Sequence, residues 1–168
     1  MMEKLKVKHV VISKQGIDSE NYKKFKEIVK KKKIKIICVG AMQRLKIESD
    51  LYFEILWPNN ENLIPENVLN NNSIVCKLYY KNFSMLFTGD IEEIAEKQIL
   101  NLYKNNLKIF HSTILKVAHH GSKTSSTQEF LDIVKPKIAL IGVGENNKFG
   151  HPNHEVLERI ENMRSQNI

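Results

Sequence analysis

Three short stretches of this sequence combine residue types that can bind a metal ion. They are FTGDIEE at 87–93, AHHGSKTSS at 118–126 and GENNKFGHPNHE at 144–155. Each stretch follows an apolar run and places a carboxylate or a histidine close to a glycine. Carboxylate oxygens and imidazole nitrogens are common ligands of divalent cations in proteins. The residue types therefore favour a metal site, provided that the fold brings the stretches together.

The elements that must position these side chains are strands followed by helices. Apolar strands are predicted at 83–89, 113–118 and 137–144, and each polar stretch begins where one of these strands ends. Ligands of open α/β sheets bind beyond the carboxyl ends of strands, where the next helices begin. We therefore expect the three junctions to converge on one site.

The remaining pattern predicts hairpins early in the chain and strand–helix units late. This order indicates an α/β layered sandwich, with helices packed on a sheet. Further strands are predicted at 7–12, 34–39, 45–49, 51–58 and 73–80, and a surface loop at 58–72. Helices are predicted to begin near Ser19, Ile91, Phe130 and Asn153. In the last of these helices, the residues expected to face inward are Val156, Leu157, Ile160 and Met163.

Asp90 has two interpretations. With Glu93 three residues later it matches the capping-box spacing, in which its side chain would satisfy free amides at a helix N-terminus. On the tight turn that Gly89 allows after an apolar strand, the same carboxylate is also placed to bind a cation. The residues alone leave both interpretations open.

His119 and His120 are adjacent at the end of a predicted strand. Successive strand residues point to opposite faces, so the two imidazoles should not present equivalent nitrogens to one metal. His120, directly before Gly121, is the preferred metal ligand, and His119 is assigned to a substrate phosphate or to support of the ligand. The alternative is a polar strand end, with Ser126 and Glu129 capping the next helix.

His151 lies in a turn that Gly150 and Pro152 shape. Its side chain either faces the substrate or belongs only to a turn in which Asn153 caps the last helix. His154, in the first turn of that helix, is expected to be exposed.

Composition indicates one globular domain over residues 1–168. The chain has 42% hydrophobic residues and a formal net charge of +7. No apolar run approaches the ~20 residues of a membrane helix, and the first residues show no secretory cleavage pattern. We therefore expect a cytoplasmic protein in which Cys38 and Cys76 stay reduced.

The positive charge is mostly lysine and is densest at 22–36. Such a run can attract polyanions, nucleic acids included. Tyr22, Phe25 and Ile28 recur in it at helical spacing, so a solvated helix face accounts for the lysines. A basic nucleic-acid-binding domain is the alternative that rests on charge alone.

The motifs from about Asn70 to Ile160 resemble the metallo-β-lactamase-like domain of the ComEC family of competence DNA-uptake proteins. The shared features are an N-S-x-V strand, a TGD turn followed by an acidic helix, an HHGS-x-T-S run and an N-x-x-G-H-P loop, in that order. Residues 1–69 resemble the preceding part of that domain more weakly. The resemblance implies an αβ/βα sandwich.

The resemblance also implies a chemistry. Members of the family bind divalent metal ions, zinc or manganese, and many hydrolyse phosphodiesters. On this sequence, Asp90 would be the bridging carboxylate and His120 a metal ligand, with His119 beside them as the third catalytic residue. Divalent cations at such a site activate water for attack on phosphorus.

Three further residues would contact the substrate on the same resemblance. Ser122, Lys123 and His151 would lie where phosphate oxygens arrive. The implied substrate is DNA during its uptake.

The sequence also departs from the family. The principal metal-binding signature, H-x-H-x-D-H, is absent, since no two histidines are separated by a single residue. Asp90 and His120 alone do not supply the roughly four ligands that a zinc site needs. We therefore expect the C-terminal part of the domain, with the missing ligands supplied by a second chain. The alternative is a non-catalytic remnant or interaction module of the same fold.

Overall fold

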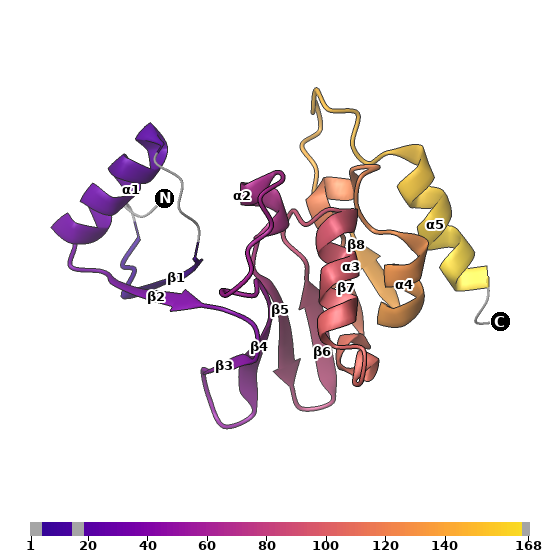
Figure 1. The fold of residues 1–168 in the computed structure, drawn as a ribbon, viewed down its shortest axis with the longest axis horizontal. Helices are drawn as coiled ribbons and strands as arrows, with labels where there is room; N and C mark the ends of the chain where they lie inside the picture. Colours follow the sequence, from indigo (N-terminus) through magenta and orange to yellow (C-terminus); the bar gives the residue numbers. More distant parts are fainter. Residues whose placement is uncertain (1–4, 15–18, 166–168) are drawn as a thin grey trace.

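The computed structural model describes residues 5–14 and 19–165 and contains two sheets with helices (Figure 1). The mixed α/β class is as predicted. The elements in chain order are β1 His9–Ser13, α1 Glu20–Lys31, β2 Lys35–Val39, β3 Gln43–Lys46, β4 Leu51–Trp57, α2 Val68–Asn71, β5 Val75–Tyr80, β6 Phe83–Phe87, α3 Glu93–Leu102, a 3-10 turn Leu107–Phe110, β7 Ile114–Lys116, a 3-10 turn Ala118–Gly121, α4 Gln128–Val134, β8 Ile138–Leu140 and α5 His154–Ser165.

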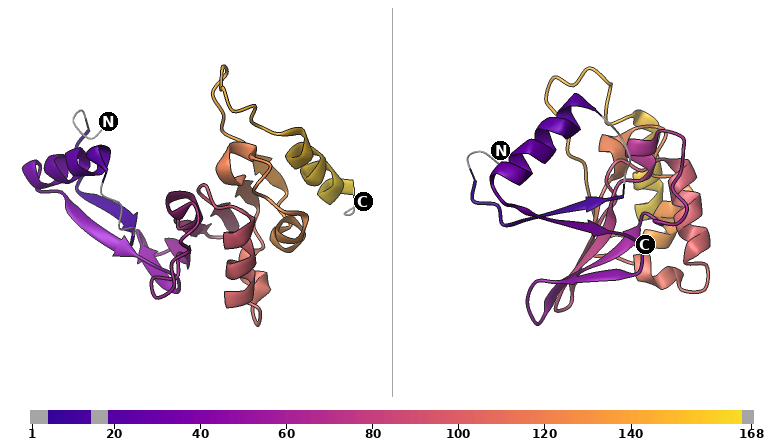
Figure 2. Two further views of the ribbon diagram at one scale, coloured as in Figure 1. Left: turned by 45° about the horizontal axis from the view of Figure 1, so that its top comes forward. Right: turned by 60° about the vertical axis from the view of Figure 1, so that its left-hand side comes forward.

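The first three elements form a small β–α–β unit. β1 and β2 pair in parallel and α1 connects them. Ser19 caps α1 as predicted, because its Oγ accepts a hydrogen bond from Tyr22 N at 3.2 Å. The lysines of α1 are exposed, while Val29 is buried. This unit lies beside the remaining elements in Figures 1 and 2.

The second sheet has six strands in the order β3-β4-β5-β6-β7-β8. Strands β3 to β6 form the two predicted hairpins and pair antiparallel. Strands β6, β7 and β8 pair in parallel. Parallel neighbours have their carboxyl ends at one edge, so the loops after these three strands start side by side.

Helices α3, α4 and α5 pack on one face of this sheet and form the core with it (Figure 2). The sheet contributes buried side chains such as Leu86 and Leu115, and α4 contributes Phe130 and Leu131. Trp57 is also buried, and its indole N–H donates to the carbonyl of Asn71 at 2.7 Å.

The opposite face of the six-stranded sheet is apolar and partly exposed. One side chain from each strand lies in a registered row across this face, and none of the six is fully buried. The sheet therefore supports a core on one side and presents apolar groups to solvent on the other. The row consists of Leu45, Phe53, Leu78, Met85, Ile114 and Ile138.

Some elements differ from their sequence predictions. The predicted loop 58–72 contains the short helix α2, and the predicted strands 113–118 and 137–144 shrink to three residues each. β7 ends early because the chain enters a 3-10 turn at Ala118–Gly121, in which His119 and His120 have positive φ. Leu157 was predicted to face inward but is 36% exposed. The single domain and the αβ/βα sandwich stay predictions.

Two leucines of adjacent strands test the difference between the faces. Leu115 is 1% exposed on the helix side, and Leu140 is 45% exposed on the other side. Leu115→Ala should lower the free energy of unfolding by about 2–5 kcal/mol, because it leaves a cavity in the core. Leu140→Ala should cost about 1 kcal/mol or less. Urea unfolding measures both, and equal losses would contradict the assignment of faces.

Candidate functional site

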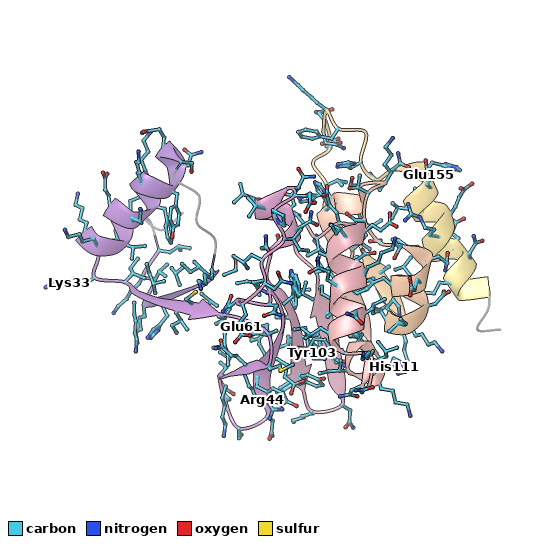
Figure 3. All side chains as sticks on the ribbon, in the orientation of Figure 1. Lys33, Arg44, Glu61, Tyr103, His111 and Glu155 are labelled. Atoms are coloured by element: carbon cyan, nitrogen blue, oxygen red, sulfur yellow. The ribbon has the colours of Figure 1, made fainter. Side chains whose placement is uncertain are left out.

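Three loops meet beyond the carboxyl ends of β6, β7 and β8, as the sequence predicts. Backbone hydrogen bonds join them: His119 N donates to Gly89 O at 3.0 Å, and Asn153 N donates to Gly121 O at 2.8 Å. Figure 3 labels Glu155, in the first turn of α5, at this end of the sheet and His111 at the opposite end. The candidate site therefore rests on a bonded set of turns.

Two glycines permit this close approach. Gly89 has φ +56° and Gly121 has φ +80°, a backbone region that side chains disfavour. A Cβ on Gly121 would lie 2.8 Å from Pro152 Cβ, and a Cβ on Gly89 would lie 2.6 Å from Ser73 Cβ. The loops could not keep these positions with any larger residue at either place.

Asp90 and His120 face each other at this end of the sheet. Asp90 Oδ1 lies 3.7 Å from His120 Nε2, and both side chains are about half exposed. His120 Nδ1 lies 2.5 Å from the carbonyl of Gly142. A carbonyl only accepts hydrogen bonds, so Nδ1 carries a proton, and Nε2 is the ring nitrogen that faces the carboxylate.

This geometry fits two positions in the coordination shell of a divalent metal. Two ligands held at 2.0–2.2 Å from a tetrahedral metal are about 3.3–3.6 Å apart, close to the observed separation. Donation of the second ring nitrogen to a carbonyl is also how proteins orient metal-binding histidines. Within residues 5–14 and 19–165, however, no group of three or more His, Cys, Asp or Glu could hold a metal. Asp90 and His120 thus fit a metal without completing its shell.

Two sequence interpretations of these residues are wrong. Asp90 does not cap α3, because that helix begins at Glu93 and Glu92 is its N-cap residue. His119 and His120 do not alternate along a strand, since both lie in a 3-10 turn with φ of 45° and 57°. The turn, rather than strand alternation, separates the two imidazoles.

His119 lies beside Glu92 and His151, and its contacts differ from those of His120. Its Nδ1 is buried without a hydrogen-bond partner, and the nearest carboxylate oxygen is Glu92 Oε1 at 3.7 Å. Its ring meets the ring of His151 edge-on, with centroids 5.9 Å apart. His119 is therefore placed to support the site from the side of α3.

Glu92 is a residue that sequence reasoning missed. It accepts hydrogen bonds from Asn67 Nδ2 at 2.8 Å, Asn71 Nδ2 at 3.2 Å and Thr124 Oγ1 at 3.2 Å. Its own amide donates to Asn71 Oδ1 at 3.0 Å. Glu92 thus links the asparagine-rich segment before β5 to the loop after His120. Its hydrogen-bond partners are distant in the sequence, and the run of asparagines before β5 is the one sequence feature that could have indicated them.

Glu96 holds the end of that loop from inside the core. Its buried carboxylate accepts from Ser126 N at 2.5 Å, Thr127 N at 2.9 Å and Thr127 Oγ1 at 2.7 Å. Burial raises the pKa of Glu96, and the donations from Thr127 and Ser126 act in the opposite direction. The alternative interpretation of the histidine pair had Ser126 capping α4, but Thr127 does so, by accepting from Phe130 N.

The two predicted phosphate contacts on this loop differ in exposure. Ser122 is buried, and its Oγ lies 3.0 Å from Thr124 Oγ1 within the same turn. Lys123 is exposed, and its carbonyl accepts from Arg159 Nη2 at 3.2 Å. The ammonium group of Lys123 is therefore the one of the two that stands at the surface.

His151 is fixed by its own loop. Asn147 Oδ1 accepts from His151 N at 2.9 Å, and Asn147 Nδ2 donates to His151 O at 2.7 Å. Partial burial, with smaller contributions from the nearby His119 and His120, lowers the pKa of His151. Asn153 caps α5 as predicted, because its Oδ1 accepts from Glu155 N at 3.1 Å. His154 is exposed, also as predicted.

Comparison with other proteins finds similarity to part of three competence-related or recombination proteins. ComE operon protein 3 of Bacillus subtilis is 32% identical over 156 residues, which are 93% of this chain and 19% of that protein. Competence protein ComA of Neisseria gonorrhoeae is 33% identical over 108 residues, or 64% of this chain and 15% of that protein. Recombination protein 2 of Haemophilus influenzae is 33% identical over 120 residues, or 68% and 14%.

The chain thus spans about a fifth or less of the length of these curated relatives. No family model matches it. In the part of the chain that the structure describes, no helix is long and apolar enough to cross a membrane.

Glu96 gives a test of how the loop is held. Glu96→Gln should lower the free energy of unfolding by about 2 kcal/mol or more, because an amide group replaces an oxygen that accepts from a buried amide. Glu93→Gln is the matched control, since Glu93 is exposed and its ion pair is with the exposed Lys97. Urea unfolding should separate the two variants, and similar small losses would argue against the buried carboxylate as a brace.

Gly121 gives a second test. Gly121→Ala should lower the free energy of unfolding by about 2 kcal/mol or more, from a strained φ and the contact with Pro152. Gly144 in the same region is the control, since an added Cβ there meets nothing within 4 Å. Thermal or urea unfolding measures both, and a neutral Gly121→Ala would rule out the close packing described.

Proposed function

We propose that this chain is the C-terminal part of a metallo-β-lactamase-like domain of the ComEC type, and that the complete domain hydrolyses phosphodiester bonds of DNA during uptake. The observation that carries the proposal is the facing pair of Asp90 Oδ1 and His120 Nε2, 3.7 Å apart. The relatives named for competence support the setting, because the chain is similar to a part of each.

The fold part of the proposal is an αβ/βα sandwich. Such a sandwich packs two sheets face to face, with helices outside, so each sheet needs an apolar inner face. The six-stranded sheet has this character: helices lie on one face, and the row from Leu45 to Ile138 lies on the other. A second sheet would cover that row.

The chemical part of the proposal follows from the two ligands. A divalent cation, zinc or manganese, lowers the pKa of water and offsets negative charge on a phosphate when it is bound. Asp90 and His120 would hold it, and Gly142 O keeps the His120 ring oriented. His119 would support the site from beside Glu92, and Lys123 would attract the phosphate backbone.

The remaining ligands would come from outside the described residues, from a second chain or from a longer protein. Curated relatives about five times as long offer room for such a segment. The second candidate is a non-catalytic module of the same fold. One observation favours this candidate. Among the residues that the structure describes, no three or more His, Cys, Asp or Glu lie close enough together to hold a metal ion.

Metal titration with matched histidine variants tests the site. Calorimetric titration with Mn²⁺ or Zn²⁺ should show binding that Asp90→Asn and His120→Ala each weaken by about tenfold or more, because each removes one of two ligands. His154→Ala is the control, since His154 is an exposed imidazole outside the site.

The same samples test catalysis. With labelled DNA and added Mn²⁺, any cleavage by the unmodified chain should be abolished by Asp90→Asn. Metal affinity that survives both site substitutions would place the metal elsewhere. Absence of both metal binding and cleavage would favour the non-catalytic module.

A further inference from the structure

Phe149 is the most exposed of the large apolar residues that the structure describes, at 82%. It lies on the loop between β8 and α5, which projects beyond the other elements at the end of the sheet that carries the candidate site (Figure 1). A single exposed apolar side chain is ordinary on a protein surface. What distinguishes Phe149 is how it is held and what lies next to it.

The loop around Phe149 is braced. Asn147 bonds both backbone groups of His151, and its own amide donates to Gly144 O at 3.2 Å. Gly150 takes φ +67°, which turns the chain directly after the aromatic ring. The base of the loop is tied to the site, because Gly142 O accepts from His120 Nδ1. The ring is therefore presented in a fixed place rather than on a free tip.

The ring forms one wall of a small slot. Phe149 and His151 lie nearly parallel, with centroids 5.9 Å apart and planes 18° from each other. A cavity of about 200 Å³ lies there, lined by Val143, Gly144 and Asn147 as well as the two rings and His120. The slot thus borders one of the two candidate metal ligands. Its lining is mostly apolar and flat, and its size suits one planar ring system.

Charges of both signs occur near the slot: Glu145 is exposed on the same loop, and Asp90 lies 3.7 Å from His120, which lines the slot. Lys148 precedes Phe149 and is exposed, and Lys123 is exposed on the neighbouring loop after His120. An exposed aromatic ring with lysines on the same and the neighbouring loop is a combination that binds single-stranded nucleic acid, where bases stack on aromatic rings and ammonium groups pair with phosphates. Bases of a duplex are already stacked and paired, so they could not enter the slot.

We propose that the slot binds an unpaired nucleobase of single-stranded DNA, with Phe149 as the stacking platform. This inference rests on the proposed function, because it identifies the form of the DNA substrate. Stacking at Phe149 positions the base beside His120, and the attached phosphate then lies toward Asp90. Phe149 is a specificity residue that selects single strands, and it holds no metal.

The test measures binding of a fluorescein-labelled oligothymidine by anisotropy, with EDTA present so that neither metal nor cleavage contributes. Phe149→Ala should weaken binding by about tenfold or more, and Phe149→Leu should weaken it nearly as much. Phe149→Trp should stay within about twofold of the unmodified chain, because indole also stacks on bases. Phe149 is exposed, so none of these variants should change the circular dichroism spectrum.

Three controls separate stacking on Phe149 from charge and from non-specific binding. Tyr80→Ala removes another exposed aromatic, at the opposite end of the sheet, and should leave binding unchanged. An oligonucleotide of the same length with abasic sites should bind the unmodified chain and Phe149→Ala equally. Lys148→Ala should instead reduce the salt dependence of binding without altering the preference for bases.

Several outcomes would overturn the inference. They are full binding by Phe149→Ala or Phe149→Leu, the same loss on the abasic strand, or no binding of single-stranded DNA by the unmodified chain. The hydrolase proposal is tested separately by Asp90→Asn with metal, a substitution that should leave the Phe149 effect in EDTA intact. If the Phe149 effect is absent while the Asp90→Asn effect is seen, the stacking proposal fails. If the reverse is seen, the hydrolase proposal fails.

Discussion

The parallel pairing of β6, β7 and β8 is the constraint on which the rest of the candidate site depends. It starts three loops at one edge, and short backbone hydrogen bonds then fasten each loop to the next. Gly121 permits the close approach of its loop to Pro152, and Gly89 permits that of its turn to Ser73 before β5, because neither residue has a side chain. The backbone arrangement alone therefore sets where Asp90, His120 and His151 lie, and their side-chain contacts only orient them.

Side-chain hydrogen bonds then orient the functional groups from behind. Glu92 and Glu96 both lie at the start of α3, yet they serve different parts of the loop after His120. Glu96 is buried and accepts from the start of α4, whereas Glu92 lies nearer the surface and accepts from Thr124 and the asparagines before β5. These two carboxylates at the start of α3 thereby hold the loop that follows both histidines. Gly142 completes the arrangement by accepting from His120.

Much of this could be predicted from the sequence, and the failures have a common cause. The hairpins, the Ser19 cap and the convergence of the three junctions follow from local periodicity and turn residues, which the chain encodes within a few positions. The left-handed conformations of His119 and His120 could not be predicted in that way, because the amide of His119 bonds to Gly89 O, on a turn 30 residues earlier in the chain. The role of Glu92 was equally hidden, since its partner Thr124 is 32 residues away.

The buried indole of Trp57 connects these observations to an optical signal. It is the single tryptophan of the chain, and its N–H donates to the carbonyl of Asn71. The side chain of Asn71 binds both the amide and the carboxylate of Glu92, which lies beside His119. The tryptophan fluorescence of the protein therefore comes from an indole that Asn71 and Glu92 connect to the histidine turn. Its emission wavelength reports whether the asparagine segment remains docked beneath the site, without any added label.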